Sequence, residues 1–129
     1  MLQLKVITPA GEVLSVNAQS VTAPGAVGEF QVLPQHLPAL SLLGGGALRY
    51  MGVDQGVLYI RGGVAEVSAD GAVVILAEET QKPDALDLDR ARSIKAEAEA
   101  ALASDEYLND ERLERIRHSI SFAEAVLNA

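Results

Sequence analysis

The residues best suited to chemistry lie in the stretch from Lys82 to Ala91, with the sequence KPDALDLDRA. Asp87 and Asp89 are close enough in sequence to act as paired carboxylates in acid–base catalysis. Capping explains them at least as well, because Asp84 or Asp87 can accept a backbone N–H bond as the N-cap of a helix. The stretch is therefore interpreted first as a hinge and second as a ligand site.

A second candidate for chemistry is His36, a potential general base that Glu29 could assist in a small hydrolase or lyase. No hydroxyl nucleophile is positioned beside His36 by the sequence, which favours a histidine in a contact loop. The GxSxG, P-loop, HExxH and EF-hand patterns are absent, and Gly44-Gly45-Gly46 is interpreted as a plain turn. With no cysteine and two histidines, neither a catalytic centre nor a metal site is expected.

The third candidate is a basic cluster formed by Arg112, Arg115, Arg117 and His118. It could balance Glu111 and Glu114 on a solvated helix face, or it could dock on an acidic partner, and both interpretations stay open. The chain as a whole has a formal net charge of -8. This acidity argues against nucleic acid or an anionic lipid surface as the main partner.

The elements that must position these residues change character at the Lys82–Ala91 stretch. Residues 1–83 contain β-branched runs separated by glycine and proline, whereas residues 84–129 contain neither glycine nor proline. We therefore predict two units, a sheet domain at 1–83 and a helical domain at 84–129. The apolar runs are far shorter than the roughly 18 residues that cross a bilayer, and the first residues resemble neither a signal nor a transit peptide. We expect a chain that is made and kept in a cytoplasm-like compartment.

The N-terminal unit is predicted to be a β-sandwich or flattened barrel of many short strands. A hairpin is expected over residues 2–16, and short strands are expected at 40–43, 47–51, 57–60 and 64–67, separated by glycine runs. The chain has two phenylalanines, three tyrosines and no tryptophan, so the core must be aliphatic.

The C-terminal unit is predicted to be an antiparallel hairpin of two amphipathic helices, which makes the fold class α+β. The expected inward faces are Ala91, Ile94, Ala98 and Ala101 or Leu102 on the first helix, and Leu113, Ile116, Ile120, Ala123 and Leu127 on the second. Burying a Leu or Ile gains roughly 1.5 to 3 kcal/mol, whereas ordering each residue costs about 1.5 kcal/mol. An alanine-rich hairpin should therefore be stable only when docked, as a movable arm would be.

Three strings in the chain resemble the epsilon subunit of the F-type ATP synthase, the equivalent of the mitochondrial delta subunit. Residues 28–38, GEFQVLPQHLP, are similar to the family's GELGILPGHxPL stretch. Tyr59-Ile60 with Gly62-Gly63, Glu66 and Val67 is similar to its YxxxGGxxEV stretch. Leu86 to Ala91 matches the family's nucleotide-site pattern of Ile or Leu, Asp, two residues of any kind, Arg and Ala. The resemblance covers nearly the whole chain.

This resemblance implies a non-catalytic rotor subunit that couples proton flow to ATP synthesis. The sandwich would be clamped to the gamma subunit and rest on the c-ring, with Glu29 and His36 in loops that face the ring. The hairpin could extend into the alpha/beta catalytic head and block ATP hydrolysis, with Arg112, Arg115 and Arg117 against acidic loops of the head. Membrane association would come only through the complex, at the cytoplasmic face of the bacterial inner membrane.

The resemblance also implies ATP as a regulatory ligand of the folded hairpin, although not as a cofactor. Asp87 and Arg90 match the motif, and Arg115 falls where ATP-binding members supply an arginine from the second helix. Gln81 replaces a glutamate of those members, for which nearby Glu79 could substitute, and Ser119 replaces a further arginine. Losing one charge-assisted contact would weaken binding by roughly ten- to a hundredfold.

Two further points follow from the resemblance and its limits. Gln31 and Gln35 stand in place of loop glycines of the family, so the resemblance does not fix the backbone shape of that loop. A free-standing ATP-sensing module, whose hairpin closes on nucleotide, is the alternative to the rotor subunit.

Overall fold

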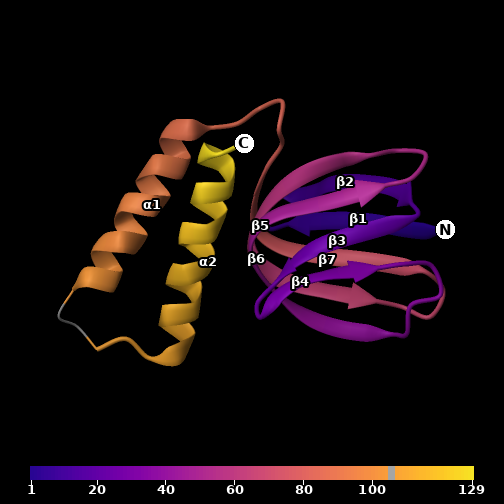
Figure 1. Cartoon of the computed structure of the whole chain (residues 1–129), viewed down its shortest axis with the longest axis horizontal. Helices are drawn as coiled ribbons and strands as arrows, with labels where there is room; N and C mark the ends of the chain where they lie inside the picture. The colour runs from indigo at the N-terminus through magenta and orange to yellow at the C-terminus, as the bar shows by residue number, and fades with distance from the viewer. Residues whose placement is uncertain (105–106) are drawn as a thin grey trace.

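The computed structural model describes residues 1–104 and 107–129, and it places a β-sheet unit beside a helical hairpin (Figure 1). The seven strands are β1 (Leu2–Thr8), β2 (Gly11–Ala18), β3 (Ser20–Gly25), β4 (Gly28–Val32), β5 (Ala39–Met51), β6 (Gly56–Val67) and β7 (Ala72–Gln81). They form one sheet in the order β2-β1-β7-β6-β5-β3-β4, in which only the β1–β7 pair is parallel among the described strands.

This sheet curves over on itself into a sandwich around a single core (Figure 1). Alternate residues of the strands point into that core, and its fully buried large side chains are aliphatic. They include Leu2, Leu4, Val6, Val21, Val32, Leu43, Leu48, Ile60, Val73 and Ile75. The predicted sandwich with an aliphatic core is confirmed.

Two predicted breaks between short strands are wrong, because the glycines lie inside long strands. Gly44-Gly45-Gly46 belongs to β5 and is not a turn, and Gly62-Gly63 belongs to β6. Gly46, Gly62 and Gly63 have positive φ values of 152°, 68° and 133°. Glycine tolerates such angles, so the two strands can bend while their pairing continues on both sides of the glycines.

Two helices follow the sheet, α1 (Leu88–Ala103) and α2 (Asp110–Leu127). Asp87, and not Asp84, caps α1 by accepting a 2.9 Å hydrogen bond from the backbone N–H of Arg90. Asn109 caps α2 in the same way. The segment between β7 and α1 contains the boundary predicted at residues 83 and 84, which stays a prediction. Within the described residues, neither helix is both long enough and apolar enough to cross a bilayer.

The inward face of α1 is the predicted one, but the buried face of α2 differs from the prediction. Ala91, Ile94 and Ala98 are buried on α1, whereas Leu102 is exposed. On α2 the buried residues are Ile116, Ser119, Phe122, Ala123 and Val126. The helix lies between α1 on one side and β5 and β6 on the other (Figure 1). It therefore buries residues on two faces, and not only on the one face predicted to contact α1.

The contact between α2 and the sheet depends on a close approach of two backbones. A Cβ atom at Gly45 of β5 would meet the carbonyl oxygen of His118 and would lie 2.7 Å from the backbone nitrogen of Phe122. Phe122 and Ala123 also pack with Ile94 of α1 in a second small core, to which Tyr59 of β6 contributes. The glycines of β5 therefore set how closely the hairpin can dock.

Candidate functional site

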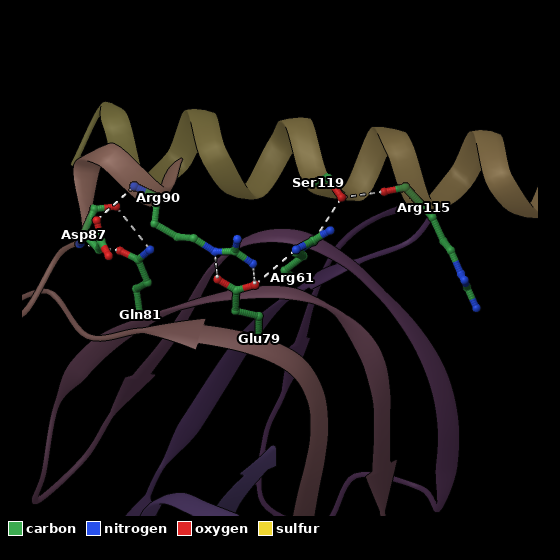
Figure 2. Close-up of polar contacts among 7 residues, drawn as sticks. All are labelled: Arg61, Glu79, Gln81, Asp87, Arg90, Arg115 and Ser119. Carbon is green, nitrogen blue, oxygen red and sulfur yellow. Dashed lines mark hydrogen bonds and ion pairs between the residues drawn. The ribbon is translucent and has the colours of Figure 1, made fainter. Parts of the chain in front are cut away.

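The polar residues at the seam between sheet and hairpin form one connected network (Figure 2). At its centre is Glu79 of β7, whose carboxylate accepts two hydrogen bonds from Arg90 of α1, at 3.0 and 3.3 Å. It accepts a third from Arg61 of β6, at 3.1 Å. One carboxylate therefore joins two strands and the first turn of a helix through charge-assisted hydrogen bonds, which are the stronger kind.

The electrostatics of this network favour the ionised form of Glu79. Burial alone would raise the pKa of its carboxyl group, whose side chain is 25% exposed. The hydrogen bonds and charge of Arg90, followed by those of Arg61, outweigh that effect and hold the pKa below its ordinary value. Glu79 in turn raises the pKa of Arg90, chiefly through the same hydrogen bonds. The network is therefore charged at neutral pH.

Gln81 at the end of β7 fixes the start of α1 in a different way. Its side-chain oxygen accepts a 2.8 Å hydrogen bond from the backbone nitrogen of Asp87, and its side-chain nitrogen donates a 3.3 Å bond to the carbonyl of Asp87. Gln81 is 8% exposed, so these bonds satisfy an amide that would otherwise be buried without partners. Asp87, the N-cap residue of α1 within the predicted hinge, is thus held against the end of β7.

The second helix joins the network through Ser119. The Nε–H of Arg61 donates a 3.0 Å hydrogen bond to the Ser119 hydroxyl oxygen, and that hydroxyl donates to the carbonyl of Arg115 at 2.9 Å. The side chain of Arg115 points away from the network (Figure 2) and pairs with Glu111 at 3.6 Å. The structure therefore brings Asp87 and Arg90 together, but not Arg115, among the three predicted ATP-binding residues.

The residues of this seam do not fit a nucleoside triphosphate as they lie. The guanidinium of Arg90 is already taken by Glu79, and Arg115 does not converge on it. The groove between α1 and α2 has a volume of about 210 Å³, and it is lined by Arg61 and Arg115 but by neither Asp87 nor Arg90. Ligand pockets usually measure about 300 Å³ or more. ATP binding at Asp87, Arg90 and Arg115 stays a prediction.

The two residues predicted to face the c-ring lie in and after β4, and both are exposed. The carboxylate oxygen Oε2 of Glu29 is 4.0 Å from Nη1 of Arg49 on β5. The Nδ1 atom of His36 is 2.6 Å from the carbonyl oxygen of Leu37. Among the described residues no hydrogen bond joins Glu29 to His36, so their geometry gives no support to a catalytic pair. Gln35 adopts a φ of 70°, a left-handed conformation that is costly for a residue other than glycine.

The three arginines of the basic cluster on α2 are exposed, whereas the side chain of His118 is only 20% exposed. Arg115 pairs with Glu111 and Arg117 pairs with Glu114 at 3.5 Å, while the exposed Arg112 follows the Asn109 cap. Such exposed pairs contribute little to stability. The arginines are therefore free to change partners, and docking on the catalytic head stays a prediction.

The sequence interpretation missed Arg61, although a usable signal was present. Arg61 interrupts the apolar run VLYIRGG, where a charged side chain beside a packed face needs a partner. The partners themselves are distant in sequence, because Ser119 lies 58 positions further along the chain.

A separate feature of the sheet is a row of apolar side chains that begins beside α2 and that the hairpin covers only in part. Leu42 pairs with Val64, Val64 with Leu76, and Leu76 with Ile7, across β5, β6, β7 and β1. Direct partners share one face of a sheet, so these four side chains form a continuous row. Leu42 is 69% exposed and Leu76 is 53% exposed. Exposed apolar residues that are contiguous in this way mark contact surfaces.

Comparison with known proteins identifies relatives over the whole chain. Residues 1–83 match the family model for the ATP synthase delta/epsilon chain β-sandwich domain. The ATP synthase epsilon chain of Nitratidesulfovibrio vulgaris strain DP4 is 45% identical over 103 residues, which cover 79% of this chain and 76% of that protein. The epsilon chain of Syntrophobacter fumaroxidans is 40% identical over 126 residues, covering 97% and 90%.

Solved structures show the same fold at lower sequence identity. A chain in the Euglena gracilis mitochondrial ATP synthase OSCP/F1/c-ring structure matches with a TM-score of 0.71 and 22% identity. The alignment covers 98% of this chain and 79% of that one. A chain of the Tetrahymena thermophila mitochondrial ATP synthase central stalk and c-ring matches with a TM-score of 0.61 and 14% identity, covering 98% and 94%.

Proposed function

Because this chain belongs to the ATP synthase delta/epsilon chain family, we propose that it is a non-catalytic rotor subunit of the central stalk. Its sandwich links the gamma subunit to the c-ring and so couples proton flow to ATP synthesis. Its hairpin is the mobile part and acts as a brake on ATP hydrolysis when it reaches the alpha/beta catalytic head. It acts at the cytoplasmic face of the bacterial inner membrane and is held there by the complex, in keeping with bacterial relatives.

The observation that carries this proposal is the apolar row of Ile7, Leu42, Val64 and Leu76. A row across four strands offers a broad, stiff surface, because each side chain is fixed by a hydrogen-bonded strand. A subunit that transmits torque needs such a rigid contact with its neighbour. We assign the row to contact with the gamma subunit.

The c-ring contact is assigned to the end of the sandwich that carries the turn after β4. This turn holds His36 and exposes Leu33 and Leu37, which are 50% and 80% exposed. Glu29 lies near the start of β4, the strand that leads into this turn, and supplies an exposed carboxylate. Mixed apolar and polar side chains of this kind suit a contact between subunits.

The test of the proposal is assembly of the complex with Leu42→Asp. A carboxylate buried in the gamma contact without a partner should lower co-purification with the gamma subunit by about tenfold or more. Met51→Asp is the matched control, because Met51 lies on the same strand and is 60% exposed, but outside the row. Equal recovery of the gamma subunit with both variants would contradict the assignment.

The same co-purification experiment distinguishes the rotor subunit from the alternative, a free-standing ATP-sensing module. It requires a monomer that binds ATP by itself and does not co-purify with a gamma subunit. The seam geometry gives this alternative no support, since Arg90 is engaged by Glu79 and Arg115 points away.

A further inference from the structure

We propose that Arg61, Glu79, Arg90 and Ser119 form an internal latch that closes the hairpin on the sandwich without a bound nucleotide. The latch would act as the release point of the brake, and that role rests on the proposed function. Closure itself depends only on contacts within this chain, so it can be tested on the isolated full-length protein.

The first step of the argument is that the latch joins sheet and hairpin twice. Glu79 of β7 binds Arg90 of α1 through two hydrogen bonds, and Arg61 of β6 binds Ser119 of α2 through one. Arg61 also binds Glu79, so the two connections share one set of charges. On the side of the sheet, one carboxylate and one guanidinium on neighbouring strands therefore hold both helices (Figure 2).

The second step is that, among the described residues, Glu79–Arg90 alone is an ion pair between the sheet and the hairpin. Within residues 1–104 and 107–129, the remaining ion pairs join strand to strand, α1 to α2, or two residues of one helix. Glu79–Arg90 is the ion pair that crosses from the sheet to the hairpin. The side chain of Glu79 is 25% exposed and that of Arg90 is 49% exposed, so solvent screens this pair less than it screens a more exposed pair such as Arg115–Glu111.

The third step is that the latch uses the groups that a phosphate would need. Arg90 donates to Glu79 from Nε and Nη2, and Arg61 donates from Nη1 to Glu79 and from Nε to Ser119. A triphosphate would have to displace Glu79, which would leave a carboxylate close to the phosphates. Glu79 balances one of the two guanidinium charges, and the nearby carboxylates of Glu97 and Asp87 also act on Arg90, so the closed hairpin needs no added anion.

The test is hydrogen exchange of the full-length chain, measured by mass spectrometry on peptides from α2. In the wild type we expect α2 to be protected without nucleotide, with a change of less than about twofold when millimolar ATP and Mg²⁺ are added. Glu79→Gln should raise the opening of α2 by about tenfold, because the two arginines then lose their shared counter-charge. Glu78→Gln is the matched control on the preceding, exposed residue of β7, and it should change the opening of α2 by less than about twofold.

Peptides from β5 and β6 report in the same experiment whether the sandwich remains folded. If Glu79→Gln exposes the sheet as well, the milder Ser119→Ala replaces it, with the exposed Ser121→Ala as control. Ser119→Ala should then open α2 several-fold more than Ser121→Ala does.

The latch is overturned if α2 needs ATP for its protection, or if the variants of Glu79 and Ser119 match their controls. Failure to bind a gamma subunit would overturn the proposed function alone, because it leaves the exchange of the isolated chain unchanged.

Discussion

At the scale of single residues, the structure makes Glu79 responsible for a pH dependence of stability. Its pKa in the folded protein lies below the ordinary value of 4.5, because Arg90 and Arg61 stabilise the carboxylate. A lowered pKa adds stability that is complete above the ordinary value and is lost as the pH falls through the folded value. The contribution should therefore be present at pH 7 and should disappear in the acid range below 4.5.

The measurement compares wild type with Glu79→Gln by urea denaturation at a series of pH values. The wild type should be more stable at pH 7, and the two unfolding free energies should converge as the pH falls below the ordinary carboxyl pKa. Glu78→Gln serves as control, since its difference from wild type should stay small throughout. A gap between wild type and Glu79→Gln that does not change with pH would rule out this account.

The residue scale also shows what the sequence can and cannot reveal. The cap at Asp87 was predictable because capping depends on residues three positions apart in one segment. The orientation of Arg115 was not, because an exposed arginine on a helix can point toward the seam or toward an acid on its own turn. The interrupted apolar run shows that Arg61 needs a partner, but the partners come from β7 and α2, and no local pattern identifies such distant residues.

At the scale of elements, the glycine run of β5 is the feature that local sequence patterns misrepresented. Glycine runs usually mark turns, and the sequence offers no sign that a helix will lie across this one. In the structure Gly45 faces the backbone of α2, at a distance that leaves no room for a methyl group. The same docking explains why the buried face of α2 includes Ser119 and Phe122, which a helix with a single partner would not bury.

This close approach predicts a selective effect of Gly45→Ala. The added Cβ would collide with the His118 carbonyl and the Phe122 nitrogen, and both belong to the backbone, so α2 must shift away from β5. We expect a loss of about 1–3 kcal/mol in unfolding free energy, as for an overpacked core, measured by chemical denaturation. Near-complete loss of α2 protection in hydrogen exchange should accompany it.

Gly44→Ala is the matched control for this substitution. Its Cβ would lie 3.2 Å from the carbonyl oxygen of Gly25 and 3.5 Å from a side-chain carbon of His118, which is much less crowded. Its effect on α2 should be clearly smaller. Similar behaviour of both variants would show that strand flexibility, and not the approach of α2, determines the docking.

At the scale of the whole molecule, the hairpin is held by modest interactions in several places. Its packing cluster contains Ala91, Ile94, Phe122, Ala123 and Val126, with help from Tyr59 of the sheet. This is a small core beside that of the sandwich, as the sequence predicted from the alanine-rich first helix. Stability that is distributed unevenly in this way allows one part to open while the other stays folded. The sandwich is thus suited to constant contact, and the hairpin is suited to release.

The last prediction concerns the released hairpin in the assembled enzyme. Arg112, Arg115 and Arg117 are exposed on α2, and the last two pair only with exposed acids of their own helix. We therefore expect all three to be able to pair with acidic loops of the catalytic head. Replacing all three by Ala should relieve inhibition and raise ATP hydrolysis by several-fold at low ionic strength, with a smaller gain at high salt.

The control is Arg92→Ala on α1, which also removes an exposed arginine from a pair within one helix. It should leave hydrolysis close to that of the wild-type complex, because the inhibitory contact is assigned to α2. Hydrolysis rates are compared in complexes that retain equal amounts of the subunit, so that loss of the chain is not mistaken for loss of the brake. Unchanged hydrolysis in the triple variant would exclude electrostatic docking, and the apolar residues of the hairpin would then have to supply the contact with the head.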